Sequence, residues 1–181
     1  MKKNILSLAI LAVIALPALA EDTDKRYFGL GYGSVSLGNA SQSSNPNVFR
    51  YVSGYHFTPM LAVEIDYSMF GNFTVGNGVD AANVSAASLQ IASVGFLPLG
   101  HDFDLIGKIG LASNIANGST TIPGHSGAYL RHSDVFIGVG AQYYVSSKFS
   151  LLAMYDNYGK FENSASPLKA SSLTLGLVYH Y

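Results

Sequence analysis

The chain has 181 residues, of which 49% are hydrophobic and only 12% are charged, with a formal net charge of -1. It has no basic excess to suggest a nucleic-acid partner and no cysteine for disulfides. The length suits one domain, and that domain must be held together by something other than disulfides.

The N-terminus has the pattern of a secretory signal peptide. Two lysines precede an apolar run from Ile5 to Leu16, and a small-residue segment ends at Ala20. A basic start, a short apolar core and an Ala-x-Ala site are typical of a segment removed after export, whereas a membrane helix would not need the cleavage site. We therefore expect residues 1–20 to be a cleaved signal peptide and residues 21–181 to form the mature domain.

The mature chain has no uninterrupted apolar stretch of the roughly 18 residues that a membrane-spanning helix would need. It instead shows strand-like alternation in eight segments. In chain order these predicted strands cover residues 27–37, 48–57, 61–70, 89–97, 104–115, 132–145, 149–160 and 173–181. In lipid every backbone N–H and C=O must be paired, so strands can cross a membrane only as a closed barrel.

The alternation is clearest from Leu61 to Phe70. Odd positions there are large and mostly aliphatic, while the even positions include Glu64 and Asp66. The last predicted strand repeats this design, with leucines and tyrosines at odd positions. Because side chains alternate between the two faces of a strand, one face suits lipid and the other is polar.

A soluble eight-stranded barrel such as a lipocalin would also alternate, but with its apolar face inside. Here the face opposite the large aliphatics carries charged, amide and glycine residues, which make a poor dry core. Aromatic residues also gather near the predicted strand ends, which suggests two interfacial girdles. They include Tyr27, Phe28, Tyr55, Phe57, Phe96, Phe103, Tyr143, Tyr144, Phe149, Tyr179 and Tyr181.

The predicted connectors alternate between short and long. Three short turns lie around Pro59, at residues 98–102 and at residues 146–148, whereas the other connectors are longer and rich in Gly, Ser, Asn and Ala. Outer-membrane barrels have short periplasmic turns and long extracellular loops. An epitope tag between Gly118 and Ser119 should therefore be exposed on intact cells, while one between Thr58 and Pro59 should be hidden and should impair folding.

Three segments together indicate a known family. The chain ends with a polar residue, Gly176, and aromatics at Tyr179 and Tyr181, which is similar to the C-terminal assembly signal of bacterial outer-membrane proteins. The segments 54–67 and 138–156 resemble the strand-turn-strand units of OmpA-like small outer-membrane barrels. The resemblance implies an all-β, eight-stranded antiparallel up-and-down transmembrane β-barrel. No sequence follows Tyr181, so we expect a stand-alone member without a C-terminal peptidoglycan-binding domain.

By strand parity, several charged residues point into the predicted lumen. They are Glu64, Asp66, Lys108, Asp156 and, on a weaker strand, Arg50. Ionised side chains in a low dielectric must be paired or hydrated. We therefore predict an internal network of ion pairs, similar to the one that plugs OmpA-like barrels. A general acid and base pair is the alternative, but small barrels have interiors only wide enough for side chains.

Two other patterns could suggest chemistry. Gly29, Gly31 and Gly33 resemble part of a phosphate loop, but their spacing puts them on one strand face, where they make room in a crowded lumen. Some eight-stranded barrels modify lipid A with a His-x-Ser pair. Here the serines directly follow His125 and His132, so each pair would point to opposite faces of a strand.

The residues thus predict a non-enzymatic outer-membrane protein whose barrel anchors four surface loops for structural, adhesive or interaction roles. The alternative is a narrow channel for ions or small solutes, and a lipid A-modifying enzyme is a weaker third hypothesis. We expect no catalytic residue, cofactor or metal. The expected partners are outer-membrane lipid and lipopolysaccharide, the barrel-assembly machinery and a surface ligand that the sequence does not identify, and we expect a monomer.

The C-terminal pattern makes a prediction about Tyr181. If the last strand is the assembly signal, deleting Tyr181 or replacing it with Asp should leave export intact but lower the amount of protein in the outer membrane. Fractionation and immunoblotting should then find precursor or degraded chain in the periplasm. Unchanged outer-membrane levels would argue against this role.

Overall fold

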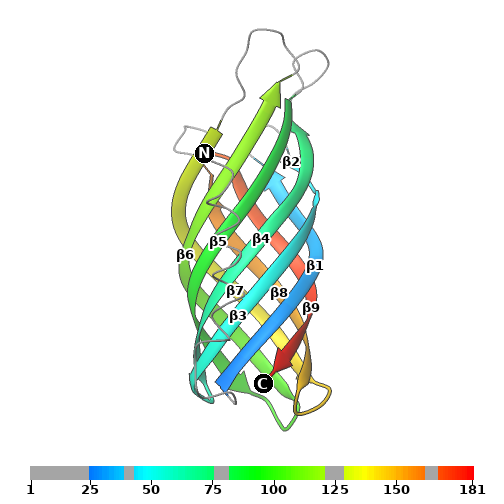
Figure 1. The fold of residues 1–181 in the computed structure, drawn as a ribbon, viewed down its shortest axis with the longest axis vertical. Helices are drawn as coiled ribbons and strands as arrows, with labels where there is room; N and C mark the ends of the chain where they lie inside the picture. The colour runs from blue at the N-terminus through cyan, green and yellow to red at the C-terminus, as the bar shows by residue number, and fades with distance from the viewer. Residues whose placement is uncertain (1–24, 39–42, 76–81, 121–128, 162–166) are drawn as a thin grey trace.

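The computed structural model describes residues 25–38, 43–75, 82–120, 129–161 and 167–181. Nearly all of them are in strands that run antiparallel to their neighbours (Figure 1). The strands are β1 (Arg26–Gly38), β2 (Ser43–Ser44), β3 (Asn47–Thr58), β4 (Leu61–Val75), β5 (Ala82–Pro98), β6 (Phe103–Thr120), β7 (Tyr129–Tyr144), β8 (Phe149–Lys160) and β9 (Lys169–His180). Among the described residues, no helix is long and apolar enough to cross a membrane.

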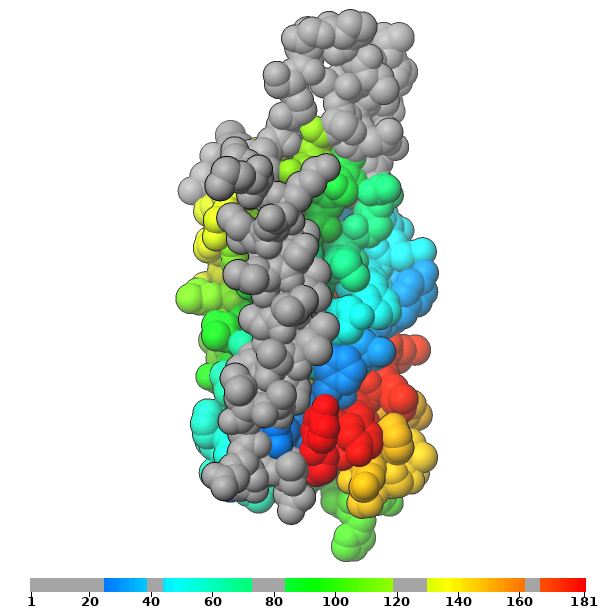
Figure 2. Space-filling view, in the orientation of Figure 1, coloured from blue at the N-terminus to red at the C-terminus, as the bar shows by residue number. Residues whose placement is uncertain are grey.

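Eight strands close into a barrel because the first and last pair with each other. The β1–β9 ladder runs from Tyr27 opposite His180 to Gly38 opposite Lys169. Figure 2 shows the side chains of the N-terminal strand (blue) beside those of the C-terminal strand (red) near the lower end. The two-residue strand β2 only extends the top of β1. The predicted eight-stranded antiparallel barrel is confirmed.

The two faces of the wall have the predicted polarity. Leucines and isoleucines of the outward face are widely exposed, Leu175 by 69% and Ile109 by 61%, whereas the inward residues are mostly buried. A soluble barrel would show the reverse. The girdle prediction was wrong for Tyr27 and Phe96, which are buried and point into the lumen, and for Tyr144, which points inward and hydrogen-bonds to Asp104.

The connectors also have the predicted asymmetry. Turns 59–60, 99–102 and 145–148 are short and lie at the end of the barrel that holds the C-terminus (Figure 1). The other connectors join the strands at the opposite end. Outer-membrane barrels keep their short turns in the periplasm, so we take the opposite end as extracellular.

The extracellular strands are longer than predicted. β5 begins at Ala82 and β6 continues to Thr120, although the sequence analysis placed these segments in loops. Gly118 and Ser119 lie in β6, opposite Val84 and Asn83 of β5, so the loop predicted at this position is wrong. The exposure of a tag there on intact cells stays a prediction. The outward residues there are polar or small, such as Ser85 and Asn117, so the sequence lacks the apolar alternation of a lipid-facing strand. The segments at His125 and Pro123-Gly124 lie outside the described residues.

The absence of native cysteine allows a direct test of the orientation. With cysteine substituted for Asn117, an exposed residue near the top of β6, a membrane-impermeant maleimide should label intact cells. With cysteine substituted for Ser147, in a short turn, labelling should require permeabilised cells. The unmodified chain is the control, and the opposite labelling pattern would reverse the orientation.

Candidate functional site

The candidate site is the charged middle of the lumen. Arg50 comes from β3, Glu64 and Asp66 from β4, Lys108 from β6 and Asp156 from β8. All five point inward, as predicted by parity, and none is more than 3% exposed. The structure therefore brings the five predicted residues together in one layer of the barrel.

Arg50 connects opposite walls of the barrel. Its Nη2 lies 2.6 Å from Asp66 Oδ2 on the neighbouring strand, and its Nη1 lies 3.1 Å from Asp156 Oδ2 on β8. Nη2 is also 3.9 Å from Glu64 Oε2. A planar guanidinium suits this role because its nitrogens can face several carboxylates at once.

Lys108 supplies the second positive charge. Its ammonium donates to Glu64 Oε2 and lies 3.4 Å from Asp66 Oδ2, so it links β6 to β4. The remaining oxygen of Glu64 accepts a 2.5 Å hydrogen bond from the hydroxyl of Tyr27. Burial of these ions costs several kcal/mol each unless they are paired. Removing one member of the network would therefore leave another buried ion without a partner.

Several buried polar atoms in and beside the network have no hydrogen-bond partner among the described residues. Three carboxylates face two cations, and among the described atoms Asp66 Oδ1 and both oxygens of Asp156 lack a hydrogen-bond donor. Gln90 lies opposite Asp66 on β5, and neither end of its buried amide is paired within the described residues. A cavity of about 10 Å³ beside Arg50 has room for about one water molecule.

Glycine makes space for the charged layer. Gly138 of β7 lies between Lys108 and Asp156, and a Cβ built on it would collide with Asp156 Oδ1. Gly29 likewise admits Val52, because a Cβ there would lie 2.6 Å from Val52 Cγ1. These contacts agree with the predicted reading of Gly29 as a lumen residue. The alternative interpretation of these glycines as a phosphate loop is wrong, because the segment is a barrel strand and the next described elements are strands.

Apolar layers close the lumen on both sides of the charges. Toward the extracellular end, Phe70, Phe136, Tyr158 and Phe161 are buried and their rings pack together. The Tyr158 hydroxyl also lies 3.1 Å from Ser68 Oγ on β4 and 2.9 Å from Ser172 Oγ on β9. Toward the periplasmic end a second buried cluster fills the lumen. It contains Tyr27, Val52, Ala62, Val94, Phe96, Ile106, Leu152, Met154 and Val178.

Sequence reasoning missed a polar cluster at the periplasmic mouth. Ser150 Oγ lies 2.9 Å from His180 Nε2, and Gln142 Nε2 lies 3.3 Å from the same nitrogen. Asp104 accepts a 2.9 Å hydrogen bond from the half-buried Tyr144. The strands of Ser150 and His180 are adjacent, but only the register brings these side chains together, and no motif spacing signals a register.

The other histidines are placed differently. His56 packs against the rings of Tyr27 and Phe96, with centroids 4.9 and 4.7 Å away, and His101 is exposed in a turn. His132 lies on β7 opposite Asn114, and His125 lies outside the described residues. Among the described residues, no three His, Cys, Asp or Glu side chains could hold a metal ion.

The C-terminal residues of the predicted assembly signal lie on the closing seam. Gly176 is opposite Gly31, and a Cβ on it would lie 2.5 Å from the Leu30 carbonyl oxygen. The rings of Tyr179 and Tyr181 are 5.1 Å apart, and the Arg26 guanidinium lies 5.6 Å from the Tyr181 ring centroid. Their role in assembly stays a prediction.

Comparison with known proteins identifies the family to which this barrel belongs. A family described as the outer membrane protein beta-barrel domain matches residues 6–181. The chain belongs to this family. It is therefore an outer-membrane β-barrel protein, located in the bacterial outer membrane, and the expected kinship with small outer-membrane barrels is confirmed. No curated protein matches the chain significantly by sequence.

Several solved outer-membrane barrels share the fold. Ail, the attachment invasion locus protein of Yersinia pestis, is 15% identical, covers 88% of this chain and 100% of its own, and has a TM-score of 0.65. Neisserial surface protein A is 18% identical, with coverages of 86% and 97% and a TM-score of 0.68. OprG from Pseudomonas aeruginosa is 11% identical, with coverages of 88% and 97% and a TM-score of 0.62. These likenesses concern the fold alone.

The close contact between Gly138 and the Asp156 carboxylate predicts the effect of adding a side chain at Gly138. Gly138→Ala should displace the Asp156 carboxylate and destabilise the barrel by about 1 to 3 kcal/mol, as expected for overpacking. The urea dependence of the gel shift between folded and boiled protein would measure this change. Gly107→Ala is a matched control, because Gly107 is exposed and a Cβ there meets nothing within 4 Å. Equal effects of the two variants would contradict the proposed packing.

Proposed function

We propose that this outer-membrane barrel is a non-enzymatic anchor, which holds four extracellular connectors for adhesive, structural or interaction roles. The observation that carries the proposal is the buried ion network. Arg50 joins β3 to β4 and to β8 across the lumen, and Lys108 joins β6 to β4. A lumen cross-linked in this way supports a plugged barrel, whose interaction surface would then be its extracellular connectors.

A conducting pore, the alternative, would need a continuous path of water. The charged layer is bounded by Phe70 and Tyr158 on the extracellular side and by Met154 on the periplasmic side, all buried in the lumen. These side chains favour the anchor over the channel. The small cavity beside Arg50 has room for a water molecule but does not make a path.

The contacts of the serine and histidine at the periplasmic mouth also favour a non-enzymatic role. A serine nucleophile needs a base that is itself oriented, usually by a carboxylate. Here Asp104 is bound to Tyr144, the contacts of His180 Nε2 are Ser150 and Gln142, and Ser150 is fully buried. This arrangement is better explained as hydrogen bonding that fixes the last strand.

A structural neighbour supports an adhesive role. Ail, at 16% identity and a TM-score of 0.64, has been solved in complex with the heparin analogue sucrose octasulfate. In this chain the extracellular end carries four connectors, against short turns at the other end. Binding residues are often on loops held by a rigid scaffold, so the end with the long connectors is the natural place for a surface ligand.

Conductance in planar bilayers separates anchor from pore. The anchor predicts no steady conductance for the wild type, and it predicts that Glu64→Gln/Asp66→Asn, which removes partners of Arg50 and Lys108, loosens the plug and introduces current. A pore predicts steady current in the wild type and a smaller cation current in the neutral variant. Steady wild-type current would reject the anchor.

A further inference from the structure

The outer wall of the barrel has an uneven charge distribution. Among the described residues, the charged side chains on the extracellular half of this wall are Arg131, Lys160 and Lys169. All three are basic and exposed, and they lie on the consecutive strands β7, β8 and β9. On the described parts of the other strands this half of the wall is apolar or neutral. We call these three residues the basic patch.

Two members of the basic patch face each other. Lys160 and Lys169 are direct partners in the β8–β9 ladder, next to the irregularity at Gly159. Like charges directly opposite each other destabilise an antiparallel pair. An anion near both ammonium groups would offset this repulsion.

One acidic residue, Asp134, lies close to the basic patch, but its carboxylate is bound to backbone N–H groups. Asp134 accepts a 2.8 Å hydrogen bond from Val135 N–H and a 2.9 Å hydrogen bond from Lys160 N–H. It thereby bridges β7 to β8 beyond Ile137, where their ladder ends. Counting Asp134 against three cations leaves a charge of +2 on the described residues.

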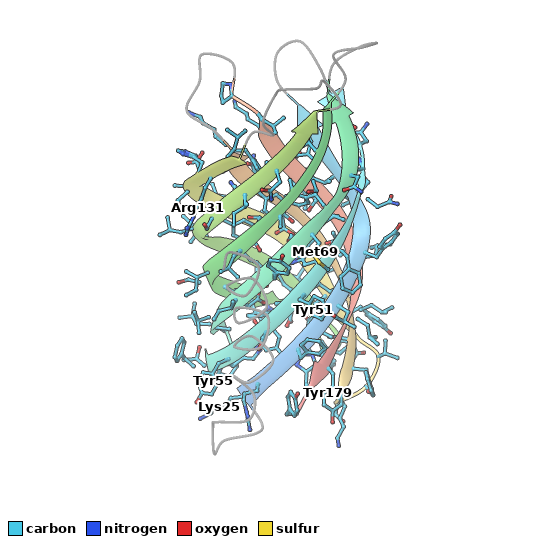
Figure 3. The ribbon with its side chains drawn as sticks, turned by 45° about the horizontal axis from the view of Figure 1, so that its top comes forward. Lys25, Tyr51, Tyr55, Met69, Arg131 and Tyr179 are labelled. Carbon is cyan, nitrogen blue, oxygen red and sulfur yellow. The ribbon has the colours of Figure 1, made fainter. Side chains whose placement is uncertain are left out.

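The basic patch lies just above the apolar band. Val135 and Leu173 are exposed by 50% and 59% on the outward face. Arg131 and Lys169 precede them by four residues in the chain, on the same face and nearer the extracellular end. A strand rises about 3.3 Å per residue, so the charges lie roughly 13 Å farther along their strands. Figure 3 shows Arg131 at the outer edge of the wall, far from Lys25 and Tyr179.

We propose that the basic patch binds the phosphate groups of lipopolysaccharide in the surrounding outer leaflet. Phosphates at the base of this glycolipid lie at the border between acyl chains and sugars, and Arg131 and Lys169 lie just beyond the last exposed aliphatic residues of their strands. Arginine and lysine are the usual phosphate ligands, and arginine can bind two oxygens at once. The inference deepens the proposed function, because it requires the connector-rich end to face outward.

The test uses the full mature protein, refolded into phosphatidylcholine vesicles with and without lipopolysaccharide. The readouts are the temperature at which the gel-shifted, folded form is lost, and the amount of lipopolysaccharide that co-purifies. Lipopolysaccharide with its phosphates removed is the second lipid. The variants are Arg131→Gln, Lys160→Gln, Lys169→Gln and their combination, with Lys148→Gln in an exposed periplasmic turn as the charge-matched control.

Phosphorylated lipopolysaccharide should raise the unfolding temperature of the wild type and of Lys148→Gln, and the dephosphorylated lipid should not. Because each basic residue near an anionic surface contributes about 1 kcal/mol, each substitution should weaken retention about fivefold and the combination roughly a hundredfold. Full stabilisation of the combined variant, or equal stabilisation by the dephosphorylated lipid, would overturn the proposal.

Two controls separate this proposal from other outcomes. Vesicles with phosphatidylglycerol test whether any anionic lipid suffices, and an equal effect there would overturn the assignment to lipopolysaccharide. Sucrose octasulfate added to the detergent-solubilised protein tests a soluble polyanion. If it raised the unfolding temperature as much as lipopolysaccharide does, and only when the basic patch is intact, the basic patch would be assigned to a soluble polyanion and the proposal overturned. If a wild type that folds in phosphatidylcholine shows steady current, the anchor fails independently of the basic patch.

Discussion

The structure depends on the requirement that every backbone N–H and C=O within the lipid be paired. The ladder between β1 and β9 satisfies this requirement for the two strands that would otherwise be edges. Closure with eight strands leaves an interior only wide enough for side chains, so the inward face of each strand must pack against the opposite wall. The arrangement of charges, glycines and aromatic rings follows from that narrow space.

The charged layer shows how such an interior can be polar. Aliphatic filling alone would have produced a dry core, yet five ionisable residues occupy the middle, between two mostly apolar clusters. Each cation contacts more than one carboxylate. Tyr27 donates a hydrogen bond to Glu64, and Gly138 leaves the space that the Asp156 carboxylate occupies. Buried ion pairs often add little net stability. Here they give the lumen one specific arrangement of its walls.

Much of this could be predicted from the sequence because a strand has a period of two. Parity alone identified the inward positions of Glu64, Asp66 and Lys108, and the asymmetry of the connectors indicated the orientation. Parity does not give the register between strands, so the contact between Ser150 and His180 could not be predicted. It also failed where the outward residues are polar or small, as at Ser85 and Asn117, and the residues around Gly118 were therefore predicted to form a loop although they pair in β6.

The long reach of Arg50 has a consequence for how the barrel forms. Its two closest carboxylates are 16 and 106 positions away along the chain, on β4 and on β8. While β8 has not yet joined the wall, Asp156 has no cation and the lumen is open to water. Joining β3 and β8 in one closed wall therefore excludes water and pairs that carboxylate with Arg50 in the same event. A half-closed barrel would hold an unpaired charge at the level of the lipid, so insertion and closure should occur as one cooperative step rather than strand by strand.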